Sequence, residues 1–139
     1  MFGIFDTSTS ALVAQRAHMD VIAGNIANKD VTRDADGNPN PYRRKVPLFS
    51  PGRVTAEGLR PGVRVDRIVE DPAPFQLRFE PTHPDAVRSG PQAGYVRMPN
   101  VDYHTEMVNL MLAQRAYEAN VSVIQVSKSV AQSSLRLIA

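Results

Sequence analysis

The fold of this chain is decided by residues 106–138, which read EMVNLMLAQRAYEANVSVIQVSKSVAQSSLRLI. Seam positions recur there at alternating spacings of three and four, which is the heptad pattern of a coiled coil. No Gly or Pro follows Pro99, so the pattern predicts one helix over about residues 102–137, roughly 54 Å long. Its expected assembly seam comprises Met107, Leu110, Gln114, Tyr117, Val121, Ile124 and Leu135.

A shorter seam of the same kind lies near the N-terminus. It comprises Leu12, Gln15, Met19, Ile22 and Ile26. This spacing predicts an amphipathic helix between Asp6 and Asn28. The tetrapeptide Ala-Gln-Arg-Ala occurs in both segments, at residues 14–17 and 113–116. We therefore expect two long helices that pair through their seams, with the exposed remainder of the longer helix packing on something else.

The middle of the chain has a different character, because all eleven prolines lie between Pro39 and Pro99. A turn-rich stretch at residues 34–41 excludes long regular elements. Short strand patterns follow at residues 42–49, 63–70, 75–79 and 95–98, with prolines separating or edging them. The predicted fold is mainly α with a small β-rich subdomain inserted between the helices. The expected domains are residues 1–28 with 102–139, and an insert of residues 29–101.

Several classes of function find no residues to support them. The chain has no cysteine, which excludes disulfides, zinc thiolate sites and thiol catalysis. His18, His83 and His104 are far apart in the sequence, and residues 34–38 lack the glutamate that a calcium loop needs. No nucleophile, phosphate-binding or metalloprotease motif is present. We therefore expect no enzyme activity, no metal and no cofactor.

The charge is unevenly distributed, since residues 37–99 carry ten basic and six acidic side chains. The most basic point is Tyr42-Arg43-Arg44-Lys45. This cluster could contact an acidic protein partner, or it could protect a strand edge from aggregation. A basic binding module for an acidic partner or RNA is thus an alternative function, with nucleic acid the less favoured ligand.

Several segments resemble a known family, the rod proteins of the bacterial flagellar basal body. The resemblance is carried by residues 25–28, 32–33, 41–45, 99–101 and 115–121; the family-motif residues are Asn25, Asn28, Thr32, Arg33, Tyr42, Arg43, Arg44, Lys45, Asn100 and Asn120. The helical segments are similar to those of rod, hook and hook-associated proteins alike. The segment Pro-Tyr-Arg-Arg-Lys after Thr-Arg is similar to the proximal rod subfamily, and another rod or hook-basal-body subunit is the sibling alternative.

The resemblance implies a structural subunit of the periplasmic drive shaft, which transmits torque and lines the export channel. Such a protein is exported through the flagellar type III apparatus without a cleaved signal peptide. Its terminal helices would form an inner layer against neighbouring subunits, with the β-rich insert outside. The implied partners are copies of itself, other rod proteins, and the basal adaptor and export gate. From the sequence itself we expect no membrane span, because no stretch approaches eighteen consecutive apolar residues, and no nucleic acid as a partner. Gln15 and Gln114 are polar seam positions, and Lys128 continues the same heptad spacing between Ile124 and Leu135. Because these polar residues interrupt the apolar seam, we expect the helix pair to be marginal in isolation.

Overall fold

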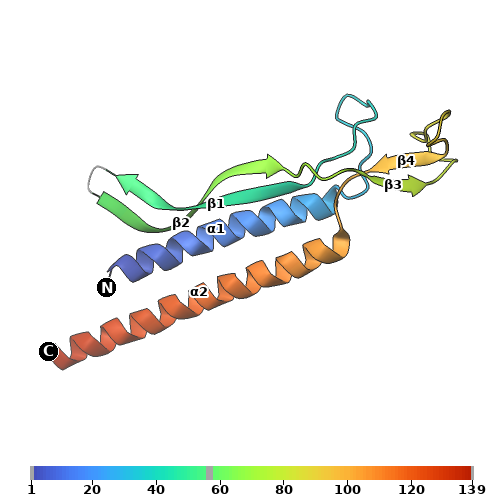
Figure 1. Cartoon of the computed structure of the whole chain (residues 1–139). Helices are drawn as coiled ribbons and strands as arrows, with labels where there is room; N and C mark the ends of the chain where they lie inside the picture. The colour runs from blue at the N-terminus through green and yellow to red at the C-terminus, as the bar shows by residue number, and fades with distance from the viewer. Residues whose placement is uncertain (1, 56–57, 139) are drawn as a thin grey trace.

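The computed structural model describes residues 2–55 and 58–138. Along the chain lie α1 (Phe2–Ala27), β1 (Lys45–Thr55), β2 (Gly58–Glu70), β3 (Gln76–Phe79), β4 (Tyr95–Met98) and α2 (Tyr103–Ile138). Figure 1 shows two long helices with a small β region between them in the sequence. The predicted fold class, mainly α with a β insert, is confirmed.

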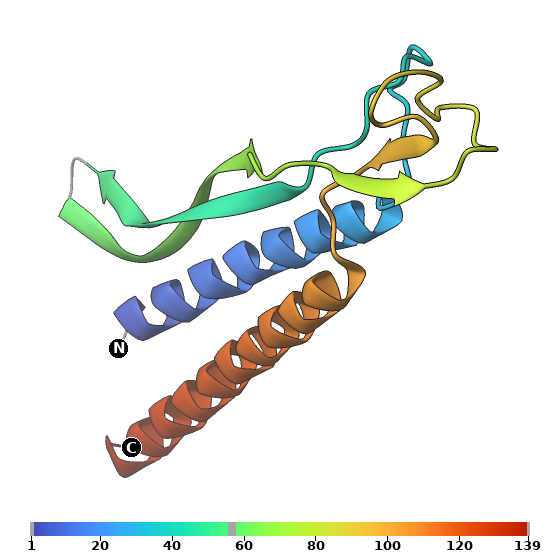
Figure 2. The same cartoon turned by 45° about the vertical axis from the view of Figure 1, so that its right-hand side comes forward.

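Helix α1 is the central element of the molecule. It packs against α2 on one side and against the β1–β2 hairpin on the other. The two helices run in opposite directions, so both chain ends lie at the same end of the molecule (Figure 1). The β3–β4 hairpin and the loops gather beyond the other end (Figure 2). Among the described helices and strands, α2 packs against α1 alone.

β4 has the predicted limits and β3 begins one residue later than predicted, but β1 and β2 differ from the prediction. β1 begins at Lys45 rather than Tyr42, and β2 begins at Gly58 rather than residue 63, so the hairpin is longer than the sequence pattern indicated. Pro47, Pro51 and Pro61 lie within these strands and do not separate them. The physical reason is that the sheet has two strands only, and a strand with an open edge tolerates a residue that lacks an N–H donor.

A glycine fixes the hairpin close to α1. Gly62 has φ +137°, and a Cβ added there would lie 2.2 Å from Oγ of Ser10. The next residue, Val63, donates its backbone N–H to the same Ser10 oxygen at 3.1 Å. Only glycine permits this close approach, because the left-handed φ and the short contact both exclude a side chain.

Among the residues whose burial is described, few hydrophobic side chains are buried. They are Ala14, Ile22, Val96, Met98, Val101 and Ala113, and Pro99 is fully buried as well. Two of these, Ala14 on α1 and Ala113 on α2, are the first alanines of the two copies of the tetrapeptide. A core of this size leaves much apolar surface for contacts outside the chain.

Candidate functional site: a polar junction and the faces of the helices

Six polar residues converge where the helices meet the β insert. We call them the polar junction: Asn25, Tyr42, Arg44, Asp71, Asn100 and Glu106. Glu106 lies in the first turn of α2 and is 0% exposed, and Asn25 lies near the end of α1 and is 1% exposed. The Asn25 side chain donates from Nδ2 to Oε2 of Glu106 at 3.0 Å. This hydrogen bond joins the two helices directly.

Asn25 also holds the start of β1. Its Nδ2 donates to the backbone carbonyl of Lys45 at 2.8 Å, and its Oδ1 accepts the Lys45 N–H at 2.9 Å. The same Oδ1 accepts the hydroxyl of Tyr42 at 3.0 Å. Burial, with the charges of Glu106 and Glu70, raises the pKa of Tyr42, so the phenol remains a donor. Asn25 therefore ties both helices and the insert together through one amide.

Arg44 is the cation at the centre of the junction. Its Nε donates to Oε1 of Glu106 at 2.7 Å, and its guanidinium lies 3.1 Å from Oδ2 of Asp71. Burial lowers the pKa of Arg44, but the hydrogen bonds and charges of the two carboxylates outweigh it and raise the pKa overall. The backbone N–H of Ala73 and the guanidinium of Arg44 together hold the pKa of Asp71 below its usual value. The backbone N–H of Arg44 donates to Oδ1 of Asn100 at 2.8 Å.

The basic cluster, for which the sequence allowed either a partner contact or protection of a strand edge, is largely engaged within the chain. Arg43 donates to the backbone carbonyls of Asp71 and Ala73, each at 3.2 Å, and its guanidinium lies 4.4 Å from the centre of the Phe75 ring. Arg44 is held in the polar junction. Lys45 is the exposed member, with Nζ 5.7 Å from the ring of Tyr42. Contact of this cluster with a partner stays a prediction, and Lys45 is its most accessible cation.

The remaining family-motif residues form hydrogen bonds within the chain. Thr32 donates its hydroxyl to Asp85 at 2.8 Å and Arg33 donates from Nε to the same carboxylate at 2.9 Å, which links the loop after α1 to the loop between β3 and β4. These hydrogen bonds, first from Arg33 and then from Thr32, lower the pKa of Asp85. Asn28 and Asn120 donate their side-chain amides to the carbonyls four residues earlier, at 2.8 Å each.

The seam residues differ in burial. Ile22 is 2% exposed, Gln114 is exposed, and Leu135 is 68% exposed. The others are half-buried: Leu12, Gln15, Met19, Ile26, Met107, Leu110, Tyr117, Val121 and Ile124. Ala14 and Ala113 are buried deeper than these, and the repeated tetrapeptide is the sequence signal that could have found them. Oε1 of Gln15 is buried and, within the described part of the chain, has no hydrogen-bond partner.

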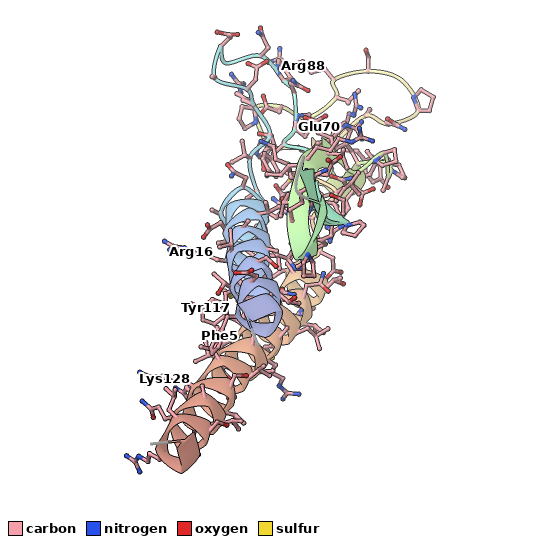
Figure 3. The ribbon with its side chains drawn as sticks, turned by 90° about the vertical axis from the view of Figure 1, so that its left-hand side faces the viewer. Phe5, Arg16, Glu70, Arg88, Tyr117 and Lys128 are labelled. Carbon is pink, nitrogen blue, oxygen red and sulfur yellow. The ribbon has the colours of Figure 1, made fainter. Side chains whose placement is uncertain are left out.

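Helix α2 also carries apolar residues on the face opposite α1. We call this the outer stripe: Val108, Leu112, Ala119, Val123, Val126 and Val130. Its valines and leucine are between 45% and 63% exposed. At 100° per residue these positions lie about half a turn from Leu110, Tyr117 and Ile124. Figure 3 shows Arg16 and Lys128 pointing outward on one side of the helices.

The described residues contain no group of three or more His, Asp or Glu side chains that could hold a metal ion. None of the helices is long and apolar enough to cross a membrane, within the same described ranges. The side chains of the polar junction hydrogen-bond to one another and to the backbone of the chain. This arrangement suits the junction to fixing α1, α2 and the start of β1 relative to one another.

Comparison with known proteins gives consistent matches over both ends and over the whole chain. Residues 5–33 match the family model described as flagella basal body rod protein, and residues 92–137 match the model of the C-terminal part of the flagellar basal body rod proteins FlgEFG. The flagellar basal-body rod protein FlgC of Yersinia enterocolitica is 44% identical, and that of Borreliella burgdorferi 40%, each over 99% of this chain and 97% of the relative. FlgC of Bacillus subtilis is 40% identical over 98% of this chain and 97% of its own length. The chain therefore belongs to the FlgC family of flagellar basal-body rod proteins.

Proposed function

We propose that this protein builds the flagellar rod through its terminal helices, which pack against further copies and other rod proteins while the polar junction holds them in a fixed relation. Family membership makes the chain a structural rod subunit. The observation that supports the helices as its assembly surfaces is that α2 is apolar on two opposite faces and only one of them meets α1. A helix with two apolar faces needs a second partner to bury the other face.

Burial of the outer stripe would contribute a substantial free energy to association between subunits. Fully burying a Val or Leu side chain contributes about 1.5–3 kcal/mol, and the five large residues of the outer stripe are each roughly half exposed. Covering them would therefore contribute roughly 4–7 kcal/mol before the entropy cost of association. One such contact is weak by itself, so stable incorporation requires that each subunit makes several.

We base the proposed location, mechanical role and export route of the subunit on its membership of the rod-protein family. The subunit would lie in the rod within the periplasm, transmit torque, line the export channel, and reach it without a cleaved signal peptide. The basal adaptor and export gate would be its neighbours at the rod base. We propose residues 1–28 and 102–139 as the inner assembly domain and residues 29–101 as the outer insert, with the β1–β2 hairpin lying along α1. The relatives are rod proteins, and we propose no catalytic role.

Two substitutions on α2 test this function. Leu110→Asp and Ile124→Asp each place a carboxylate in the half-buried seam, and both should block incorporation into the rod because a charge there cannot be buried without a partner. Gln125→Asp adds the same charge at an exposed neighbouring position and serves as the control. The variants would be expressed in cells lacking the wild-type chain, with cellular levels, basal-body content and swimming measured. Normal rods and swimming with both seam variants would contradict the proposal.

A further inference from the structure

An apolar groove runs along α1 beside the β1–β2 hairpin. It consists of two hollows that share Ala17, one of about 510 Å³ that reaches from Asp6 past Val13 to the hairpin, and one of about 440 Å³ that continues to Asn28. The α1 side of the groove carries small residues, namely Ser10, Ala14, Ala17 and Gly24. A Cβ added at Gly24 would meet nothing within 4 Å. Small residues of this kind let another helix approach closely.

The groove and the outer stripe of α2 have matching lengths. From Asp6 to Asn28 the groove covers 22 residue steps of α1, which is about 33 Å. From Val108 to Val130 the outer stripe also covers 22 steps. The two surfaces lie on different sides of one chain, because α2 meets α1 through its other face. One chain therefore cannot fill its own groove with its own outer stripe.

We propose that the groove of one copy receives the outer stripe of α2 from a second copy, with that helix antiparallel to α1. The inference rests on the proposed function, since it names which surfaces of neighbouring subunits meet. Aligning the ends of the two surfaces places Val108 beside Asn28 and Ala119 against Ala17. The helices thus meet at their midpoint through two alanines, where their backbones can approach most closely.

Charge selects the antiparallel direction. Arg115 lies on the same face of α2 as the outer stripe, between Leu112 and Ala119, and Asp20 lines the groove. Neither has an ion pair in residues 2–55 and 58–138. In the antiparallel alignment Arg115 falls beside Asp20, whereas in the parallel alignment it falls against the apolar Val13. An arginine placed in an interface requires a carboxylate partner to offset its desolvation.

The contact has a consequence for the form of the assembly. The groove and the outer stripe are different surfaces, so the contact between them is heterologous. After two copies pair, one keeps a free outer stripe and the other a free groove, and each can bind a further copy. Such a contact builds a continuing series of subunits, which stays open unless the rotation closes it into a ring, rather than a two-fold dimer. In that chain α1 lies between its own α2, the hairpin and the α2 of a neighbour.

Disulfide cross-linking tests the pairing, because the natural chain contains no cysteine. The full-length variant carrying Ala17→Cys and Ala119→Cys would be expressed in cells lacking the wild-type chain, and isolated basal bodies would be oxidised. We expect a ladder of dimers, trimers and longer species, with no more than a dimer from either single variant. Ala17→Cys with Gln125→Cys, which lies off the outer stripe, is the matched control and should give no ladder.

Co-expression of the two single-cysteine chains gives a second measurement that does not depend on the double variant folding. It should yield dimers that contain one chain of each kind. A charge exchange then tests direction: Asp20→Arg and Arg115→Asp should each lower cross-linking about two- to fivefold, and the two together should restore it.

Two results would overturn the pairing while leaving the proposed function intact. One is a normal amount of the chain in basal bodies without cross-linking between positions 17 and 119, and the other is cross-linking from either position to a different rod protein only. Absence of the single-cysteine chains from basal bodies, at normal cellular levels, would instead count against the proposed function itself.

Discussion

Replacing Glu106 by glutamine tests whether the polar junction fixes the two helices. Glutamine has the same size, so no cavity forms, but it lacks the charge and has only one acceptor oxygen. In the structure both carboxylate oxygens accept, one from Arg44 Nε and the other from Asn25 Nδ2. Whichever way the Gln amide turns, one donor of the junction faces another donor.

The expected loss follows from these contacts. A hydrogen bond to a charged group is worth about 1.5–3 kcal/mol, and an unmatched buried donor costs about 1–3 kcal/mol. Arg44 keeps Asp71 as its partner and its side chain is 22% exposed, so the cost stays below that of isolating a fully buried charge, about 3–5 kcal/mol. We expect Glu106→Gln to destabilise the junction by about 2 kcal/mol, which corresponds to roughly 30-fold.

Amide hydrogen exchange on the full-length chain measures the stability of the polar junction locally. The measurement does not require that the chain unfolds in a single global transition. Amides of residues 22–26 and 107–110 should exchange roughly 30-fold faster in Glu106→Gln. Glu118→Gln, at an exposed position on the same helix, is the control and should change exchange by about twofold or less. A change below about threefold in Glu106→Gln would show that the junction does not hold the helices together.

Two further predictions concern the face of α1 that is covered within the chain. Gln15→Leu removes a buried acceptor that has no partner among the described residues, and should stabilise the helix pair by about 1 kcal/mol in thermal melting followed by circular dichroism; Gln114→Leu, at an exposed position, should not. Burial lowers the pKa of His18 from 6.5, outweighing the charge of Glu106, so the neutral imidazole is favoured in the folded chain. Its stabilising contribution is therefore complete above pH 6.5 and is lost as the pH falls through the lower folded pKa. His18→Phe should reduce the decrease in melting temperature between pH 7 and pH 5, and an unchanged decrease would contradict this.

The helices could be predicted from the sequence because their signals are local and repeated. Heptad spacing from Met107 onward and the confinement of prolines to residues 39–99 both depend only on near neighbours, and α2 ends within a residue or two of its predicted limits. The strand limits were predicted less well. Proline usually argues against a strand, but Pro47 and Pro51 lie in a two-stranded sheet, where that rule is relaxed.

The polar junction could not be predicted, because its hydrogen bonds join residues that are far apart in sequence. Asn25 and Glu106 are separated by 81 positions, and Arg44 and Glu106 by 62. In the sequence, Glu106 is an ordinary acidic residue in the first turn of a helix, where such residues are favoured. The positive charges of Arg43 and Arg44 can be read directly from the sequence. The carbonyls and carboxylates that bind them belong to distant segments, so their pairing cannot be read from it.

The prolines within β1 bear on what happens to copies that are not yet assembled. An unassembled subunit at high concentration can pair the exposed edge of its β-sheet with strands of other copies, and such pairing can lead to fibrils. Along β1, a recruited strand would encounter two residues, Pro47 and Pro51, that have no N–H to offer. Strand-by-strand stacking on the β1 margin is thereby discouraged, which agrees with the proposal that copies associate through their helices.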